Sequence, residues 1–379
     1  MGGVMREKLK VLHVYKTYYP DTDGGIEKVL QQLMLGLKKL NVENRLLVLS
    51  SNCEPAVIQY PEGQIIRCPI TLEVASNPMS ISAFSTFRQQ ISWADVVHYQ
   101  FPWPFADLLN ILSCTKKPSV VSYQSDIVRQ KGLMKLYRPL MMSFLKKADF
   151  VCASSENYLR TSEVLNSLDK APVVIPNGIN DLSLEKVADS FLEKWRNFAG
   201  GKFFLFVGVL RYYKGIHTLI KAAALNGLPV IIAGTGPEMK KLQMEAKSLG
   251  ANKVRFVGRI SEEDKKALLQ LCCGFVFPSH LRSEAFGMSL VEASIYAKPM
   301  ISCEIGTGTS YVNLHEKTGY VVAPEDEVAL ADAMKKLYEN PNHARELGRN
   351  ARLHYESQFT ASGMAERYRA VYEDILNEY

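Results

Sequence analysis

Short apolar runs alternate with longer stretches of mixed polarity along most of the chain. In the first half, runs at residues 9–15, 45–50, 94–100, 119–124, 149–154 and 172–176 have the length and the β-branched content of buried strands. After the first run, apolar residues recur at helical spacing and predict one buried helix face, made of Val29, Leu30, Leu33, Met34, Leu37 and Leu40. Strands that alternate with helices predict an α/β fold with a parallel sheet and helices on both faces.

A second series of apolar runs follows the more polar stretch 177–195. It predicts six further strands, at 202–210, 229–234, 254–258, 274–278, 299–304 and 319–323. We therefore expect two doubly wound, Rossmann-like domains, 1–178 and 179–358, and a last amphipathic helix within 359–379. Two such domains in series bring two sets of strand carboxyl ends to one cleft, which is where open α/β sheets bind ligands.

The bulk composition limits the classes of function. With 379 residues, of which 47% are hydrophobic, the chain is long enough to fill two cores. The formal net charge of +6 is mild, and no nucleic-acid-binding motif accompanies it. No apolar run reaches spanning length and the N-terminus has no apolar signal core, which predicts a cytoplasmic protein. The seven scattered cysteines include no CxxC pair and are typical of reduced thiols.

Residues 129–148 contain six basic residues and no acidic ones, with Leu, Met, Tyr and Phe between them. Such a helix can lie on an anionic membrane surface, which would hold the protein at the inner face of the plasma membrane. The same pattern also fits a core-packed helix with a solvated basic face. The sequence leaves both interpretations open.

The run SEAFGMSLVEA carries the most specific chemistry in the chain. Glu284 lies in a loop between a predicted strand and a predicted helix, and Glu292 is expected about two turns inside that helix. The free amides of Gly287, Met288 and Ser289 at the helix start form an anion site between the two carboxylates. A nucleotide sugar has a phosphate that can bind the amides and hydroxyls that can bind the carboxylates. The plainer alternative is a helix-start glutamate and a solvated helix position.

Other candidate residues also follow predicted strands. Gly24 and Gly25 open the first helix, where paired glycines either let a phosphate approach the backbone or form a tight turn. Arg211 and Lys214 follow the strand that ends near Gly208. Two cations in that place can neutralise a leaving diphosphate, or they can remain solvated loop charges.

The remaining loops give weaker signals. Gln124 and Asp126 follow a strand, and Asp126 can orient a sugar, accept a proton or cap the next helix. The G-x-G runs at 234–236 and 306–308 lack the third glycine of a dinucleotide fingerprint, which disfavours a dehydrogenase and favours turns. The sequence has no acidic cluster and no pair of histidines spaced for a divalent ion, so we expect neither a metal nor another cofactor.

Taken together, these runs resemble the retaining glycosyltransferases of family 4, which have the GT-B fold of two Rossmann-like domains. The resemblance covers nearly the whole chain, and the E-x7-E spacing of Glu284 and Glu292 is its most specific element. The matching runs, in chain order, are GGIEKV, YQSDIV, VIPNGI, FVGVLRYYKG, IAGTGPE, FVGRIS, FPSHLRSEAFGMSLVEA and TGYVV.

The resemblance implies roles for the matching residues. Lys214, with Arg211 nearby, would hold the donor diphosphate, and Glu284 would contact hydroxyls of the donor sugar. Glu292 would bind the ribose hydroxyls. The helix within 359–379 would return to the first domain. The other donor contacts that the resemblance implies are Gly24, Gly25, Arg259, Ile260, Phe286, Gly287, Met288, Ser289 and Leu290.

The chain departs from the family pattern at two positions. Gln124 stands where relatives usually have His, and a glutamine can donate a hydrogen bond to a sugar but cannot act as an acid or a base. Val209 stands where relatives tend to have Arg, and Arg211 follows two residues later.

By resemblance, the chain would be a metal-independent, retaining hexosyltransferase. The runs YQSDIVRQK and CEIGTGTSYVN look most like those of bacterial enzymes that build O-antigen in lipopolysaccharide biosynthesis. They favour GDP-mannose as donor and a saccharide or lipid-linked acceptor. The alternatives are a UDP-linked glucose, galactose or N-acetylhexosamine donor, a GT-B nucleotide-sugar epimerase, or a non-catalytic sugar-binding relative.

Overall fold

The structure, a computed structural model, describes residues 8–74, 76–127 and 131–378, and for 131–134 it describes only the backbone. The chain forms two compact units. The first consists of Met1–Gly178 together with Ala361–Tyr379, and the second is Ile179–Thr360. Each unit is built around one mainly parallel sheet, which confirms the predicted α/β class.

The sheet of the first unit has the strand order β10-β9-β8-β7-β1-β2-β4-β3, with only β3 antiparallel to its neighbour. A separate antiparallel pair, β5 and β6, lies outside it. All six strands predicted for this half are present, whereas β3 to β6 were not predicted. The strands are β1 (Leu9–Val14), β2 (Val42–Ser50), β3 (Val57–Tyr60), β4 (Gly63–Pro69), β5 (Leu72–Val74), β6 (Asn77–Met79), β7 (Val96–Phe101), β8 (Ser119–Tyr123), β9 (Phe150–Ala153) and β10 (Val173–Val174).

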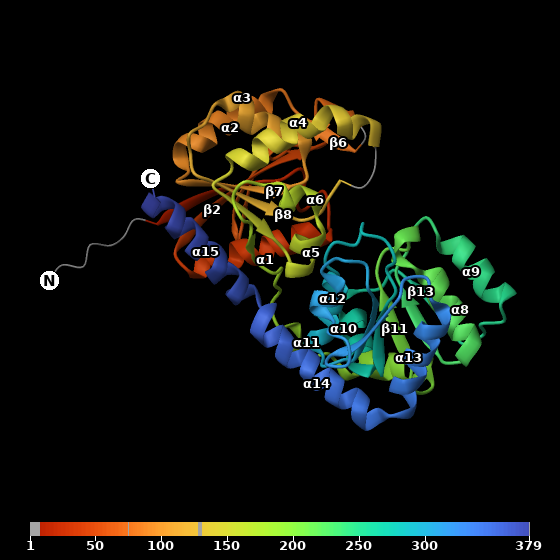
Figure 1. The fold of residues 1–379 in the computed structure, drawn as a ribbon. Helices are drawn as coiled ribbons and strands as arrows, with labels where there is room; N and C mark the ends of the chain where they lie inside the picture. The colour runs from red at the N-terminus through yellow and green to blue at the C-terminus, as the bar shows by residue number, and fades with distance from the viewer. Residues whose placement is uncertain (1–7, 75, 128–130, 379) are drawn as a thin grey trace. The chain divides into compact units, whose positions relative to one another are not determined.

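Helices cover both faces of this sheet. Figure 1 shows α2, α3 and α4 on one face and α1 and α15 on the other. The predicted face of α1 is buried, except that Leu40, just past the helix end, is only half-buried. Gly36 of α1 lets α15 approach closely, because a Cβ there would lie 2.6 Å from Cβ of Ala365. The helices are α1 (Gly25–Lys39), α2 (Ser82–Trp93), α3 (Pro104–Ser113), α4 (Lys131–Lys147), α5 (Glu156–Thr161), α6 (Glu163–Asn166) and α15 (Ala361–Glu378).

The basic segment 129–148 corresponds largely to α4. Residues 129 and 130 lie outside the described part of the chain. Met141, Phe144 and Leu145 are buried, while Lys135 and Leu136 are exposed, Leu136 to 83%. The described part of α4 therefore packs into the core and carries an exposed basic face, and membrane contact stays a prediction. Among the described helices, none is long and apolar enough to cross a membrane.

The second unit has the strand order β13-β12-β11-β14-β15-β16, all parallel. These are the six strands predicted for this half, with the same bounds for β13 and tighter bounds for the other five. They are β11 (Phe204–Val207), β12 (Val230–Ala233), β13 (Val254–Gly258), β14 (Gly274–Phe277), β15 (Met300–Cys303) and β16 (Gly319–Val322).

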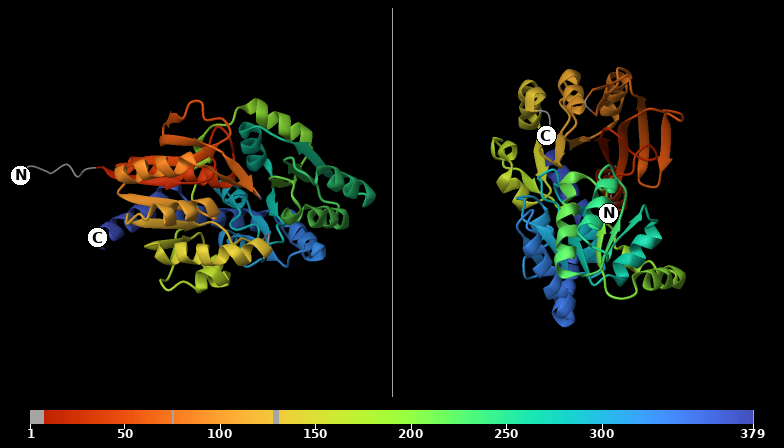
Figure 2. Two further views of the ribbon diagram at one scale, coloured as in Figure 1. Left: turned by 90° about the horizontal axis from the view of Figure 1, so that it is seen from above. Right: turned by 90° about the vertical axis from the view of Figure 1, so that its right-hand side faces the viewer.

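Two groups of helices pack around this second sheet. One group contains α8 in contact with α9 and α13, and the other contains α10 against α7 and α11 against α14. Figure 2 shows both units from two further directions. The helices are α7 (Asp189–Ala199), α8 (Ile216–Asn226), α9 (Met239–Ser248), α10 (Glu262–Leu271), α11 (Met288–Ile295), α12 (Thr309–Val312), α13 (Glu327–Glu339) and α14 (Pro341–Gln358).

Candidate active site

Two loops of the second unit bring the strongest candidates together. β11 and β14 are neighbouring parallel strands, so the loops that leave their carboxyl ends lie side by side. The loop after β11 ends in a short 3₁₀ turn, Tyr212–Lys214, and the loop after β14 contains Glu284. The backbone N–H of His280 donates to the carbonyl of Tyr213 over 3.0 Å and ties the two loops to each other.

Lys214 and Glu284 form an ion pair between these loops. The Lys214 ammonium contacts Oε2 of Glu284, and Ser279 donates to the same oxygen over 3.3 Å. Both side chains of the pair are only 12% exposed. The ammonium also lies 4.7 Å from the centre of the Phe277 ring, a cation–π distance. Lys214 is thus held in one position at the carboxyl edge of the sheet and is not a solvated loop charge.

Glu292 lies nearer the start of its helix than predicted. α11 begins at Met288, so Glu292 is its fifth residue and lies about one turn inside, not two. Gly287 precedes the helix with φ +92°, a left-handed conformation that favours glycine. Phe286 and Leu290 are buried, so any donor contact there would come from backbone. Helix amides at this start point away from the helix body and attract anions.

Glu292 also has a cationic partner, which the sequence interpretation missed. Lys265 of α10 donates to Oε1 of Glu292 over 2.8 Å and pairs equally closely with Glu262. Lys265 is buried, and its two carboxylates raise its pKa to about 12 despite the opposing effect of burial. In the sequence, Lys265 lies three residues after Glu262, which predicts only an ion pair within one helix. The contact with Glu292, 27 residues away, depends on the tertiary fold.

The other donor-side candidates lie farther along the same sheet edge. Arg211 is exposed at the start of the Tyr212–Lys214 turn. Arg259 is exposed and Ile260 half-buried after β13, which β12 separates from β11 in the sheet. Their assigned roles remain predictions.

In the first unit, Gly24 and Gly25 precede and begin α1 as predicted. A Cβ on Gly25 would meet nothing within 4 Å, so the protein's own packing does not require this glycine. A Cβ on Gly24 would lie 2.4 Å from Oε2 of Glu27. This carboxylate, which had no assigned role, is buried in the first turn and accepts hydrogen bonds from Thr17 and Thr22.

The loop after β8 is held by side-chain hydrogen bonds. Gln124 is buried, donates to Gln100 over 3.0 Å and accepts from Asn177 over 3.2 Å. Oδ1 of Asp126 accepts from the hydroxyls of Tyr123 and Ser162 over 2.8 and 2.7 Å. Both side chains therefore have structural partners within their own unit.

The two G-x-G runs are turns that allow close backbone packing. A Cβ on Gly236 would lie 2.4 Å from the carbonyl oxygen of Leu210. In the second run, the N–H of Gly308 donates to the carbonyl of Ala285 over 2.8 Å. The first run packs on the loop that carries Lys214, and the second packs on the loop that carries Glu284. Both runs therefore help to hold these loops in position.

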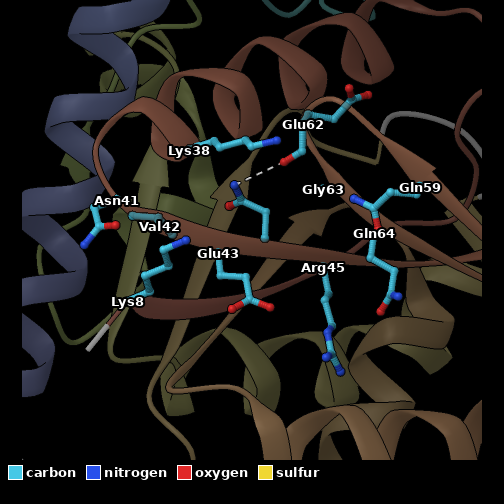
Figure 3. Close-up of a pocket in the computed structure, with 11 residues that line it drawn as sticks. Lys8, Lys38, Asn41, Val42, Glu43, Arg45, Gln59, Glu62, Gly63 and Gln64 are labelled. Atoms are coloured by element: carbon cyan, nitrogen blue, oxygen red, sulfur yellow. Dashed lines mark hydrogen bonds between the residues drawn. The ribbon is translucent and has the colours of Figure 1, made fainter. Parts of the chain in front are cut away.

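One pocket of about 290 Å³ lies away from all of these residues, and Figure 3 shows its lining. It lies at the amino ends of β1, β2 and β4 and is lined by Lys8, Lys38, Glu43, Arg45, Glu62 and six further residues. Asn44, which also lines the pocket, donates to the carbonyl of Glu62 over 3.4 Å. Ligands of parallel sheets bind at the opposite, carboxyl ends, so this pocket is not part of the candidate site.

Two family models match successive parts of the chain. "Glycosyltransferase Family 4" matches residues 23–181, and "Glycosyl transferases group 1" matches residues 188–354. Together they cover most of both units.

Two relatives are similar over nearly their full length. The D-rhamnosyltransferase WbpZ of Pseudomonas aeruginosa is 49% identical over 353 residues, 93% of either chain. The O-antigen chain mannosyltransferase C of Escherichia coli is 43% identical over 368 residues, 97% of this chain and 99% of its own.

Solved structures share the fold at much lower identity. Sucrose-phosphate synthase from Thermosynechococcus elongatus is 21% identical with a TM-score of 0.80, over 98% of this chain and 100% of that one. HepE from Anabaena, solved in complex with UDP, is 17% identical with a TM-score of 0.77, over 97% and 100%.

Proposed function

The chain belongs to glycosyltransferase family 4 and has the GT-B fold, and from this premise we propose that it transfers a mannose-configured hexose, with retention, in bacterial surface-polysaccharide assembly. The donor we propose is GDP-mannose or its 6-deoxy form, GDP-D-rhamnose. The acceptor is a saccharide or a lipid-linked saccharide.

The sugars in the names of the two relatives support the choice of donor sugar. One is named for D-rhamnose and the other for mannose. D-Rhamnose is 6-deoxy-D-mannose, so the two sugars have the same configuration and differ only at carbon 6. A sequence identity above 40% over more than 90% of the chain supports a donor pocket that binds sugars with the configuration of mannose. UDP-linked donors remain the alternative that a donor test must exclude.

The observation that carries the proposed chemistry is the fixed, mostly buried Lys214 beside Glu284, close to the start of α11. When the glycosidic bond to a nucleoside diphosphate breaks, negative charge develops on the leaving phosphate. A fixed ammonium and helix-start amides stabilise that charge without rearranging during the reaction. Glu284 holds the ammonium and presents a carboxylate to sugar hydroxyls. Both relatives above 40% identity are named as transferases, which supports transfer and not epimerisation.

We propose that no protein side chain forms a covalent bond to the sugar. The acceptor would attack from the face that the diphosphate leaves, and the diphosphate would take the acceptor proton. Gln124 cannot act as a base, and the carboxylate of Asp126 already accepts two hydroxyl hydrogen bonds. The exposed basic face of α4, with Lys135, Leu136 and Arg138, supports contact with the anionic membrane that would hold a lipid-linked acceptor.

A thermal-shift panel tests the donor. A ligand that binds only the folded protein raises Tm by mass action, so GDP-mannose or GDP-D-rhamnose should raise Tm more than UDP-glucose, UDP-galactose or UDP-N-acetylglucosamine at equal concentration. Transfer assays with the stabilising donor should then give an α-linked product. A larger shift from a UDP-sugar would replace the proposed donor.

Glu292→Gln should raise the KM for the donor by about tenfold or more and lower kcat less, because we assign Glu292 to ribose binding and not to chemistry. Steady-state kinetics with varied donor measures the split. Glu262→Gln is the matched control, because it removes the other carboxylate on Lys265 and is not assigned to the donor. Equal effects of both changes would show that Glu292 acts only through Lys265.

Asp126→Asn should leave clearly measurable transfer with an unchanged α-linkage, because asparagine keeps an oxygen that can accept from Tyr123 and Ser162. If Asp126 were a general base, the loss would be about a hundredfold or more. Nuclear magnetic resonance of the product gives the linkage. A β-linked product from the α-linked donor would overturn the retaining mechanism.

Activity should survive EDTA, because Lys214 and helix amides already face the leaving diphosphate. Initial rates are compared before and after chelation and gel filtration. A complete loss that Mg²⁺ or Mn²⁺ restores would contradict metal-independent transfer.

A further inference from the structure

Three residues with metal-ligating side chains meet at the carboxyl edge of the second sheet, although they are far apart in the sequence. His217 is the second residue of α8, His280 follows β14, and Glu325 follows β16. Their ligand atoms all lie within 4.8 Å of one another. Oε1 of Glu325 is 3.8 Å from Nε2 of His217 and 3.9 Å from Nε2 of His280. These distances are too long for hydrogen bonds.

His280 is the most unusual member of the cluster. Its side chain is 1% exposed, yet neither of its ring nitrogens has a hydrogen-bond partner among the described residues. A buried polar group without a partner costs about 1–3 kcal/mol, and such groups in folded proteins call for a specific explanation. Nε2 is the nitrogen on the side of Glu325, toward the centre of the cluster.

The surroundings hold both imidazoles in place and favour their neutral form. The Tyr212 ring stacks on His217 with a centroid distance of 5.5 Å and meets His280 edge-on at 4.9 Å. Burial is the main cause that lowers the pKa of both histidines below the ordinary value. A neutral imidazole has a lone pair available to a metal. Glu325 is 59% exposed and can adjust its position.

We propose that His217, His280 and Glu325 bind a divalent transition metal of the zinc type. Zinc accepts two histidines and one carboxylate at bond lengths of about 2.0–2.2 Å. In a tetrahedral site, such bonds place ligand atoms about 3.3–3.5 Å apart. The two pairs that include Glu325 need to close by about half an ångström, and the two histidines, which lie within 4.8 Å of each other, by at most about 1.5 Å. The fourth position is left for water.

The ligand set selects against magnesium and calcium. Both ions prefer six or more oxygen ligands, whereas imidazole nitrogen suits zinc, nickel and copper. The metal does not enter the proposed transfer, which uses Lys214 and helix amides, and this inference does not depend on that function. A bound ion would instead connect the start of α8 with the loops after β14 and β16, and α8 directly follows the turn that carries Lys214.

The inference is tested by zinc binding to chelator-treated protein that carries no affinity tag. We expect one equivalent of Zn²⁺ to bind with micromolar or tighter affinity in competition with a chromogenic chelator. Co²⁺ in its place should give the visible absorption of a tetrahedral nitrogen–oxygen site. Mg²⁺ at millimolar concentration should not compete.

Variants identify the ligands. His217→Ala and Glu325→Gln should each weaken Zn²⁺ binding at least about tenfold, since even outer partners of a metal site are worth roughly 10–100-fold. Glu325 is exposed, so Glu325→Gln tests the site without a risk to folding. His343→Ala is the control, because His343 is an exposed histidine 3.7 Å from Glu346 in an ordinary surface pair. Unchanged affinity in Glu325→Gln and His217→Ala, an equal loss in His343→Ala, or no saturable Zn²⁺ binding by the unmodified chain would overturn the inference.

Discussion

Lys214→Ala should lower kcat by about a hundredfold, with a smaller change in the KM for the donor. The expected size is that of losing one fixed group that stabilises charge in the transition state, about 2.7 kcal/mol. KM should change less because the diphosphate carries more charge on its leaving oxygen in the transition state than in the bound donor. Steady-state kinetics with the donor that the thermal-shift panel selects gives both constants.

The environment of Lys214 makes a control for stability necessary. The ammonium neutralises the largely buried Glu284 and lies over the Phe277 ring, so alanine removes these contacts together with the volume of a largely buried side chain. Lys214→Met keeps most of the stem and should lose the same activity with a smaller drop in Tm. Lys240→Ala, at an exposed position on α9, should change neither quantity. A near-normal kcat in Lys214→Met would show that the Lys214 ammonium does not stabilise the transition state.

Gly215→Ala should destabilise the protein by about 3 kcal/mol or more and abolish most of its transfer activity. Gly215 has φ +67°, where an L-residue costs roughly 1–2 kcal/mol. A Cβ there would also lie 1.9 Å from the carbonyl oxygen of Pro278, so the two loops that carry Lys214 and Glu284 would have to separate. Such overpacking typically adds about 1–3 kcal/mol. Denaturant unfolding and transfer kinetics measure the two effects.

Gly227→Ala separates the two causes. Gly227 has nearly the same backbone conformation, φ +65°, but a Cβ there would meet nothing within 4 Å. It should therefore show the conformational cost alone and keep full activity. If both alanine variants were equally stable and active, the close approach of Gly215 to Pro278 would not be required for the arrangement of the two loops.

The six strands of the second unit and six of the ten in the first could be predicted from the sequence because strands buried on both faces appear as continuous apolar runs. β3 and β5 were missed because they are short and largely exposed, with polar residues among the apolar ones. Lys214 and Glu284 could be proposed because each directly follows such a run. The depth of Glu292 in α11 was overestimated, since the five residues from Met288 to Glu292 make little more than one turn.

The unpredicted residues share one property, which is that their partners are distant in sequence. Lys265 appears in the sequence as an ordinary charge on an amphipathic helix, and only the packing of α10 near α11 gives it Glu292. His217, His280 and Glu325 are separated by 45 residues or more, so no local spacing could indicate a metal. Local patterns identify single ligands, whereas a cluster is defined by the order of strands in the sheet.

The return of the chain to its first unit has a consequence for synthesis on the ribosome. α15 supplies Tyr368 and Tyr372 to the interior of that unit, and the hydroxyl of Tyr372 hydrogen-bonds Nδ1 of the fully buried His98 over 2.7 Å. The first half of the nascent chain therefore cannot complete its core until the last residues emerge, whereas Ile179–Thr360 can close earlier. A premature stop codon near the 3′ end of the message would damage the unit that was translated first, and the amino-terminal half cannot be produced intact as a separate fragment.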